Sequence, residues 1–232
     1  MVRLESKERL NHLKFSIIVF DEFPKALRQT FKVMWDKKFR RNQWDDSDAV
    51  RKLLHRNEFG NKGIPTQKSY EEWDCTALFK ATLYAKSFRS PDGTGNLKTL
   101  DELYLKPRGV PTGQFHGSVI SANGDPYETF ALSIDQLRRL RNSLCHSTST
   151  ELDQNMFDQY VNLAKDAFEA LSVKTDSIDE TLHAELHTLR ARVLTCAFFF
   201  LPHLWSFVGD SALRLMHLDR MCTIITNKMA DH

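Results

Sequence analysis

Apolar residues recur at helical spacing along most of this chain, and in residues 130–146 the recurrence carries an arginine into the apolar stripe. Phe130, Ile134 and Leu137 lie on one face of the helix that this spacing predicts. At 100° per residue, Arg141 lies about 20° from Phe130, in the middle of that stripe. Because a buried guanidinium needs an anion or several acceptors, we expect Arg141 to have a specific role.

Polar residues surround this arginine. Arg138, Asn142 and Cys145 lie on the adjoining flank of the predicted helix, and His146 follows Asn142 by one helical turn. A helical wheel drawn at the same 100° per residue places Arg139 on the polar side of the predicted helix. The sequence therefore predicts a cationic, hydrogen-bonding cluster at one end of a helix, with one titratable imidazole.

This pattern carries a family resemblance. The sequence RNSLCHS, which contains Arg141, Asn142 and His146, resembles the R-x4-6-H signature of HEPN domains, small helical bundles found in many RNA-cutting proteins. Residues 147–171 are similar to the subgroup attached to the DAZ-interacting zinc-finger ubiquitin ligase, in which an LRN…HS helix precedes a helix that opens with Asp and Phe. Upstream segments are similar in kind, so that the resemblance covers roughly residues 21–173.

The resemblance implies an RNA-binding protein whose candidate activity is that of a metal-independent endoribonuclease leaving 2′,3′-cyclic phosphate ends. In this reading His146 transfers a proton, because histidine is the side chain best suited to that role near neutral pH. Arg141 clamps the phosphate through two parallel N–H groups and stabilises its developing charge. Asn142 orients the histidine or the phosphate.

Cleavage needs both a base and an acid, and one motif supplies one histidine. HEPN nucleases pair two domains with their motifs facing, so the resemblance implies a homodimer. The alternative gives these residues structural roles: Arg141 bonds helix-end carbonyls, Asn142 caps and His146 ends the helix. The domain would then be a non-catalytic protein-interaction module in ubiquitin or innate-immune assemblies.

The overall charge favours no particular partner, since the formal net charge is +2 and the sequence pI is near 8.3. RNA would need a local basic patch. The candidate RNA-binding residues are Lys37, Lys38, Arg40, Arg41 and Arg138. The alternative for the first four is a solvated helix end, where cations complement the helix dipole.

The predicted fold is an all-α bundle of five or more helices. Helices are expected over residues 3–20, 24 to near 41, 49–56, 69–88, 130–146, 150–171 and 179–193. Pro24 is expected in the first turn of the second helix, and Thr150 with Asp153 at the start of the sixth. Residues 106–128, here called the insert, hold four of the nine glycines and three of the seven prolines, with a short β-prone run at 116–121. The insert forms either a rim over the motif or a surface excursion.

We expect a HEPN-like domain over residues 1–175 and a helical extension over 176–232. Within the extension, residues 193–209 carry no formal charge over seventeen positions, the lower limit for spanning a bilayer. Pro202 and His203 interrupt this segment, so a buried hairpin or dimer helix is favoured over a membrane anchor.

Neither a disulfide framework nor a metal site is indicated. The four cysteines are widely separated and form no C-x-x-C pair. His183, Glu185 and His187 lack a further ligand nearby, and their order is not that of metalloproteases. We expect no cofactor, and a reducing compartment, the cytoplasm, because the charged N-terminus does not resemble a secretory signal.

Overall fold

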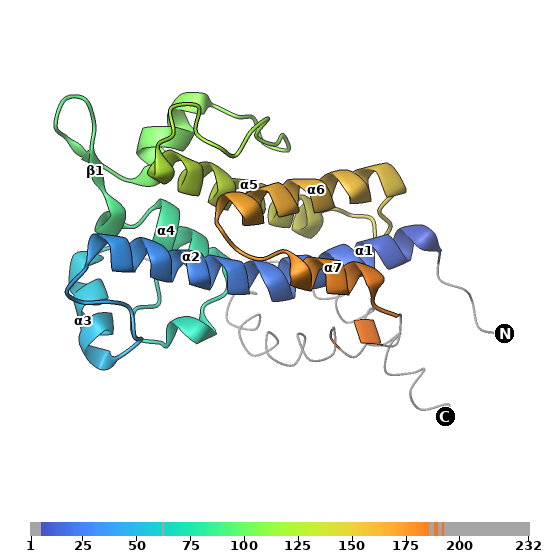
Figure 1. Ribbon diagram of the computed structural model, residues 1–232, viewed down its shortest axis with the longest axis horizontal. Coiled ribbons are helices and arrows are strands. Elements are labelled where there is room, and N and C mark those ends of the chain that lie inside the picture. Colours follow the sequence, from blue (N-terminus) through green and yellow to red (C-terminus); the bar gives the residue numbers. More distant parts are fainter. Residues whose placement is uncertain (1–5, 62, 186–187, 190–191, 193–232) are drawn as a thin grey trace. The chain divides into compact units, whose positions relative to one another are not determined.

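The computed structural model describes residues 6–61, 63–185, 188–189 and 192. It is mostly helical, which confirms the all-α prediction. The chain divides into two compact units, Met1–Glu180 and Thr181–His232. Helices α1 to α6 all belong to the first unit (Figure 1). The boundary expected after residue 175 stays a prediction.

The first two helices are continuous. Helix α1 spans Lys7–Ile17, and the Ser6 hydroxyl accepts a hydrogen bond from the Arg9 N–H group at its start. A π-helical turn, Ile18–Glu22, leads directly into α2, Phe23–Lys38. Pro24 lies in the first turn of α2, where its missing N–H group is not needed. We expected a break between two helices near residues 21–23, but the structure has a widened π-helical turn within one long continuous helix there.

The next region contains two short α-helices, each started by a side-chain cap. Helix α3, Asp48–Asn57, begins where the Ser47 hydroxyl accepts from the Val50 N–H group. Helix α4, Cys75–Leu83, begins where the Asp74 carboxylate accepts from the Ala77 N–H group at 2.7 Å. The single helix expected over residues 69–88 is wrong. Residues 74 and 85 have extended backbones, so that 3-10 turns at Tyr70–Glu72 and Lys86–Phe88 flank α4.

An aromatic cluster packs the second half of α2 against the segments that flank α3 and α4. Its members are Phe31, Trp35, Trp44, Tyr70, Trp73 and Phe88. The rings of Phe31 and Trp44 meet edge to face with centroids 4.7 Å apart. Both tryptophans at 35 and 73 are almost completely buried. This cluster fixes the end of α2 against the loops on either side of α3.

The Glu58 carboxylate joins the end of α3 to the 3-10 turn Lys86–Phe88. It is buried, and it accepts hydrogen bonds from the N–H groups of Lys86 at 2.9 Å and Ser87 at 2.7 Å. The Ser87 hydroxyl and the Asn61 amide also donate to it. All of its described partners are donors, so the charged form is the one that fits the site.

We predict that Glu58→Gln lowers the free energy of unfolding by about 2 kcal/mol, because the new amide group turns two of its hydrogens toward other donors. Urea denaturation followed by circular dichroism measures this change. Glu72→Gln is the matched control, since Glu72 is exposed. Equal stability of the two variants would contradict the structural role of Glu58.

The second half of the first unit contains the motif helix. A hairpin of β1, Ser90–Pro91, and β2, Leu97–Lys98, is followed by a π-helical turn, Asp101–Leu105, and a 3-10 turn, Lys106–Arg108. The β-prone run at 116–121 forms no strand in the described structure. The remaining helices are α5, Pro126–His146, α6, Gln154–Ala170, and α7, Asp176–His183. Helix α5 packs against α4 and α6, and α6 also packs against α1.

Candidate functional site

The motif residues lie in the last turns of α5. Arg141 and Asn142 are half-buried, whereas His146 is exposed. The Arg141 guanidinium donates a hydrogen bond to Oδ1 of Asn142 at 3.1 Å. Neither Arg141 nor His146 forms an ion pair with a residue that the structure describes. The only described acceptor of Arg141 is therefore a neutral amide, and no carboxylate of a described residue neutralises its charge.

Arg141 lies within electrostatic reach of Cys75, the first residue of α4. Burial raises the pKa of the Cys75 thiol to about 12, and the positive charge of Arg141 acts in the opposite direction. Cys75 is thus a neutral core thiol whose sulfur points to the Val19 carbonyl. It is not an activated nucleophile.

The most buried charge on α5 belongs to Asp135, which the sequence did not single out. Its side chain has no exposed surface, and it accepts hydrogen bonds from His116 Nε2 at 2.7 Å, Arg138 Nε at 2.7 Å and Arg139 Nε at 2.6 Å. Burial acts to raise the pKa of Asp135, but the bond from His116 and the two arginine charges outweigh it. The pKa therefore lies well below its usual range. We call these four residues the Asp135 cluster.

Arg139 attaches the insert to α5. Beyond Asp135, its guanidinium donates to the carbonyl groups of Val110, Pro111 and Gln114 at 2.9 to 3.1 Å. A helical wheel places Arg139 on the polar side of the helix, and its partners there are indeed polar, but the insert covers this side. For the same reason burial on α5 does not follow one stripe: every residue from 130 to 137 is buried, whereas Arg141 is only half-buried.

The insert is held by further side chains of α5. The Gln136 amide oxygen accepts from the His116 N–H group at 2.9 Å, and the Ser133 hydroxyl donates to the Val119 carbonyl at 3.4 Å. Near the start of α5, the Thr129 hydroxyl accepts from the Ser121 N–H group at 3.0 Å. The insert is thus packed along α5 from Thr129 to Arg139, and the motif follows from Arg141.

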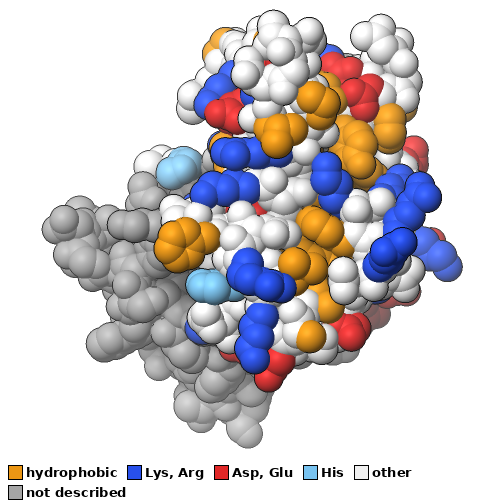
Figure 2. Space-filling model, turned by 90° about the vertical axis from the view of Figure 1, so that its left-hand side faces the viewer, with side chains coloured by type: hydrophobic (Ala, Val, Ile, Leu, Met, Phe, Trp, Pro, Cys, Tyr) orange, Lys and Arg blue, Asp and Glu red, His pale blue; other side chains and the backbone are white. Residues whose placement is uncertain are grey.

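The predicted RNA-binding residues near the end of α2 form what we call the basic end: Lys37, Lys38, Arg40 and Arg41. Lys37 lies over the Phe130 ring, 5.1 Å from its centroid, and Lys38 donates to the Arg89 carbonyl at 3.0 Å. Arg40 and Arg41 are exposed, without a side-chain partner among the described residues. Lys and Arg side chains alternate with hydrophobic ones on this face of the molecule (Figure 2).

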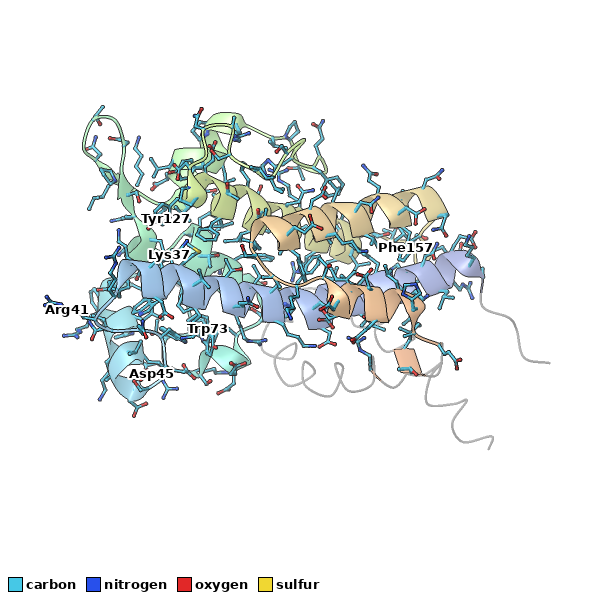
Figure 3. All side chains as sticks on the ribbon, viewed as in Figure 1. Lys37, Arg41, Asp45, Trp73, Tyr127 and Phe157 are labelled. Atoms are coloured by element: carbon cyan, nitrogen blue, oxygen red, sulfur yellow. The ribbon has the colours of Figure 1, made fainter. Side chains whose placement is uncertain are left out.

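The basic end and the motif lie far apart. Phe130, which contacts Lys37, precedes His146 by sixteen residues of the same helix, a rise of about 24 Å. In Figure 3, Lys37 and Arg41 lie toward one side, whereas Phe157, in the first turn of α6, lies toward the other. The structure therefore brings Arg141, Asn142 and His146 together, and separates them from the basic end. Arg138 lies between the two and is engaged with Asp135.

No group of three or more His, Cys, Asp or Glu side chains that would suit a metal ion occurs among the described residues. In that same part of the chain, none of the helices combines the length and apolar character needed to cross a bilayer. Residues 193–209 and His187 lie outside the described residues.

Comparisons of this chain with protein-family models, with curated proteins and with solved structures found no match.

Proposed function

We propose that this chain is an RNA-binding protein of the HEPN type that cleaves RNA without a metal ion, through Arg141, Asn142 and His146. The observation that carries the proposal is the contrast between neighbouring arginines of α5. Arg138 and Arg139 are engaged with the Asp135 carboxylate, whereas Arg141 bonds only a neutral amide among the described residues. Its positive charge remains available to an anion such as a phosphodiester.

The chemistry follows from these groups. A base removes the proton of the 2′-hydroxyl, the 2′-oxygen attacks phosphorus, and the bond to the 5′-oxygen breaks as an acid protonates that oxygen. The products are a 2′,3′-cyclic phosphate and a 5′-hydroxyl end. His146 performs one of the proton transfers, and Arg141 stabilises the charge that develops on the phosphate oxygens.

The second proton transfer calls for a second histidine. We propose that two copies of the chain pair with their motifs facing, so that each supplies one His146. The exposed position of His146 at the end of α5 supports this arrangement, because an exposed imidazole is accessible to a second protomer. We further propose that the basic end holds the RNA backbone at a distance from the cleaved bond, and that the protein acts in the cytoplasm.

We predict that the purified chain cleaves a random-sequence single-stranded RNA pool in the presence of EDTA, and that Arg141→Ala and His146→Ala each lower the rate about a hundredfold. Gel analysis of end-labelled RNA and detection of the cyclic phosphate measure the reaction. Arg56→Ala is the matched control, because Arg56 is exposed on α3 without a side-chain partner among the described residues.

Folded Arg141→Ala and His146→Ala proteins that cleave as fast as the parent would reject the enzyme. The second candidate function, a non-catalytic protein-interaction module in ubiquitin or innate-immune assemblies, would then take its place. A groove beside α6 favours this second candidate, and it requires no chemistry from the motif.

A further inference from the structure

An open groove runs between α6 and the insert. Its larger part has a volume of about 620 Å³ and its smaller part about 330 Å³, and the two parts share Gly117 as a lining residue. Neither part is lined by Arg141, Asn142 or His146. Figure 1 shows the light-green insert beside α5 and α6. We call this feature the α6 groove.

One wall of the α6 groove is a single stripe of α6. Its lining residues, spaced three or four apart, are Met156, Gln159, Tyr160, Leu163, Asp166, Glu169 and Ala170. The stripe rises about 21 Å along the helix, which matches about six residues of an extended peptide. Met156 is 41 % exposed, so its side chain is accessible to a ligand in the groove.

The other wall is the chain itself, at residues 113–120 of the insert. His116 and Val119 anchor this wall to α5 through Gln136 and Ser133. Between these anchors, Gly117 and Ser118 are exposed, and their N–H groups donate to no acceptor among the described residues. An anchored backbone with free N–H donors can bond the carbonyl groups of a bound peptide.

The two parts of the α6 groove differ in chemistry. In the larger part, the rings of Phe115 and Tyr160 meet edge to face at 5.5 Å and give an apolar floor beside Met156. The smaller part is bordered by the exposed carboxylates of Asp166 and Glu169, neither of which forms an ion pair with a described residue. This negative charge, which no described cation compensates, opposes RNA and favours a cationic side chain.

We propose that the α6 groove binds an extended peptide segment of a partner protein. A bulky apolar side chain of this peptide lies against Phe115 and Met156, and a Lys or Arg side chain lies between Asp166 and Glu169. The peptide backbone pairs with Gly117 and Ser118. The proposal is independent of RNA cleavage, because the groove and the motif share no residue.

A random heptapeptide display library, selected on the full chain, tests this proposal. We expect enriched peptides to combine a large apolar residue with Lys or Arg. The best of them, made with a fluorescent label, should bind the Asp166→Lys/Glu169→Lys protein about tenfold more weakly in fluorescence anisotropy, because two rim ion pairs are lost. Met156→Asp should weaken binding by a similar factor.

The matched control is Glu72→Lys/Glu180→Lys, which adds the same charge at exposed positions that do not line the groove. It should bind the peptide as the parent does. Failure to enrich any peptide, enrichment of acidic peptides, or equal binding to the Asp166→Lys/Glu169→Lys protein would each overturn the proposal. A fourth outcome would also overturn the proposal: no peptide is enriched, and the charge-reversed protein binds the RNA pool more tightly than the parent. The face would then bind nucleic acid only in the mutant.

Discussion

Replacing Asp135 by alanine will lower the free energy of unfolding by about 4 kcal/mol, the range seen when one partner of a buried ion pair is removed. The substitution leaves Arg138, Arg139 and His116 without the carboxylate that all three share. It also loosens the insert, because that carboxylate positions the Arg139 guanidinium and bonds His116 of the insert. Urea denaturation of the full chain, followed by circular dichroism, measures the loss.

Asp166→Ala is the matched control, because its carboxylate is exposed, and it should change stability by less than about 0.5 kcal/mol. The pH dependence gives a second readout. The folded state holds the pKa of Asp135 below its ordinary value. The contribution of Asp135 to the free energy of unfolding is therefore complete above the unfolded pKa of about 3.9, and it is lost as pH falls toward the pKa of the folded state. The difference in free energy of unfolding between the parent and Asp135→Ala should therefore become smaller below a pH of about 4. A pH-independent difference would contradict the electrostatic explanation.

Replacing Trp35 by alanine will cost about 4 kcal/mol of stability, because it opens a cavity in the aromatic cluster. The Trp35 side chain is completely buried, and its ring lies 5.1 Å from Trp44 and 4.2 Å from Phe39. The loss is therefore mainly one of packing. Thermal unfolding and urea denaturation measure it, with Phe59→Ala as the control, since Phe59 is 77 % exposed.

Trp35→Phe distinguishes the contribution of ring packing from that of the indole hydrogen bond. The indole N–H group donates to the Asn42 carbonyl at 2.7 Å, and this bond holds the turn that carries Arg40 and Arg41. The phenylalanine variant should lose about 1 to 2 kcal/mol and retain a folded core. A Trp35→Ala protein as stable as the parent would show that the cluster can collapse around the missing ring.

Local sequence signals were sufficient to predict most helices. The apolar period predicts where they lie, and short polar side chains mark where they start. For α6 the expected start was Thr150 with Asp153, and Asp153 itself caps the helix by accepting from the Met156 N–H group. Pro24 was likewise correctly placed in a first turn. The π-helical turn before it was not predictable, because a widened turn leaves no distinct spacing of apolar residues.

The candidate site was predictable only in part. Arg141, Asn142 and His146 lie together because they are neighbours on one helix, which a wheel describes well. The role of Arg139 was missed because the wheel contains no information about the insert, which lies up to 29 residues earlier in the chain. Asp135 carried a usable signal, since it precedes Arg138 and Arg139 by three and four positions, the spacing of helical ion pairs. Its burial required knowledge of the tertiary packing.

Arg139 recognises the insert only through main-chain oxygens, those of residues 110, 111 and 114. Carbonyl groups are the same for every amino acid, so these three positions are chemically free to diverge among descendants of this sequence. The constraint falls instead on the guanidinium and on Asp135, which positions it. Rapid drift at residues 110, 111 and 114, combined with an invariant pair on α5, is the evolutionary signature expected of this attachment.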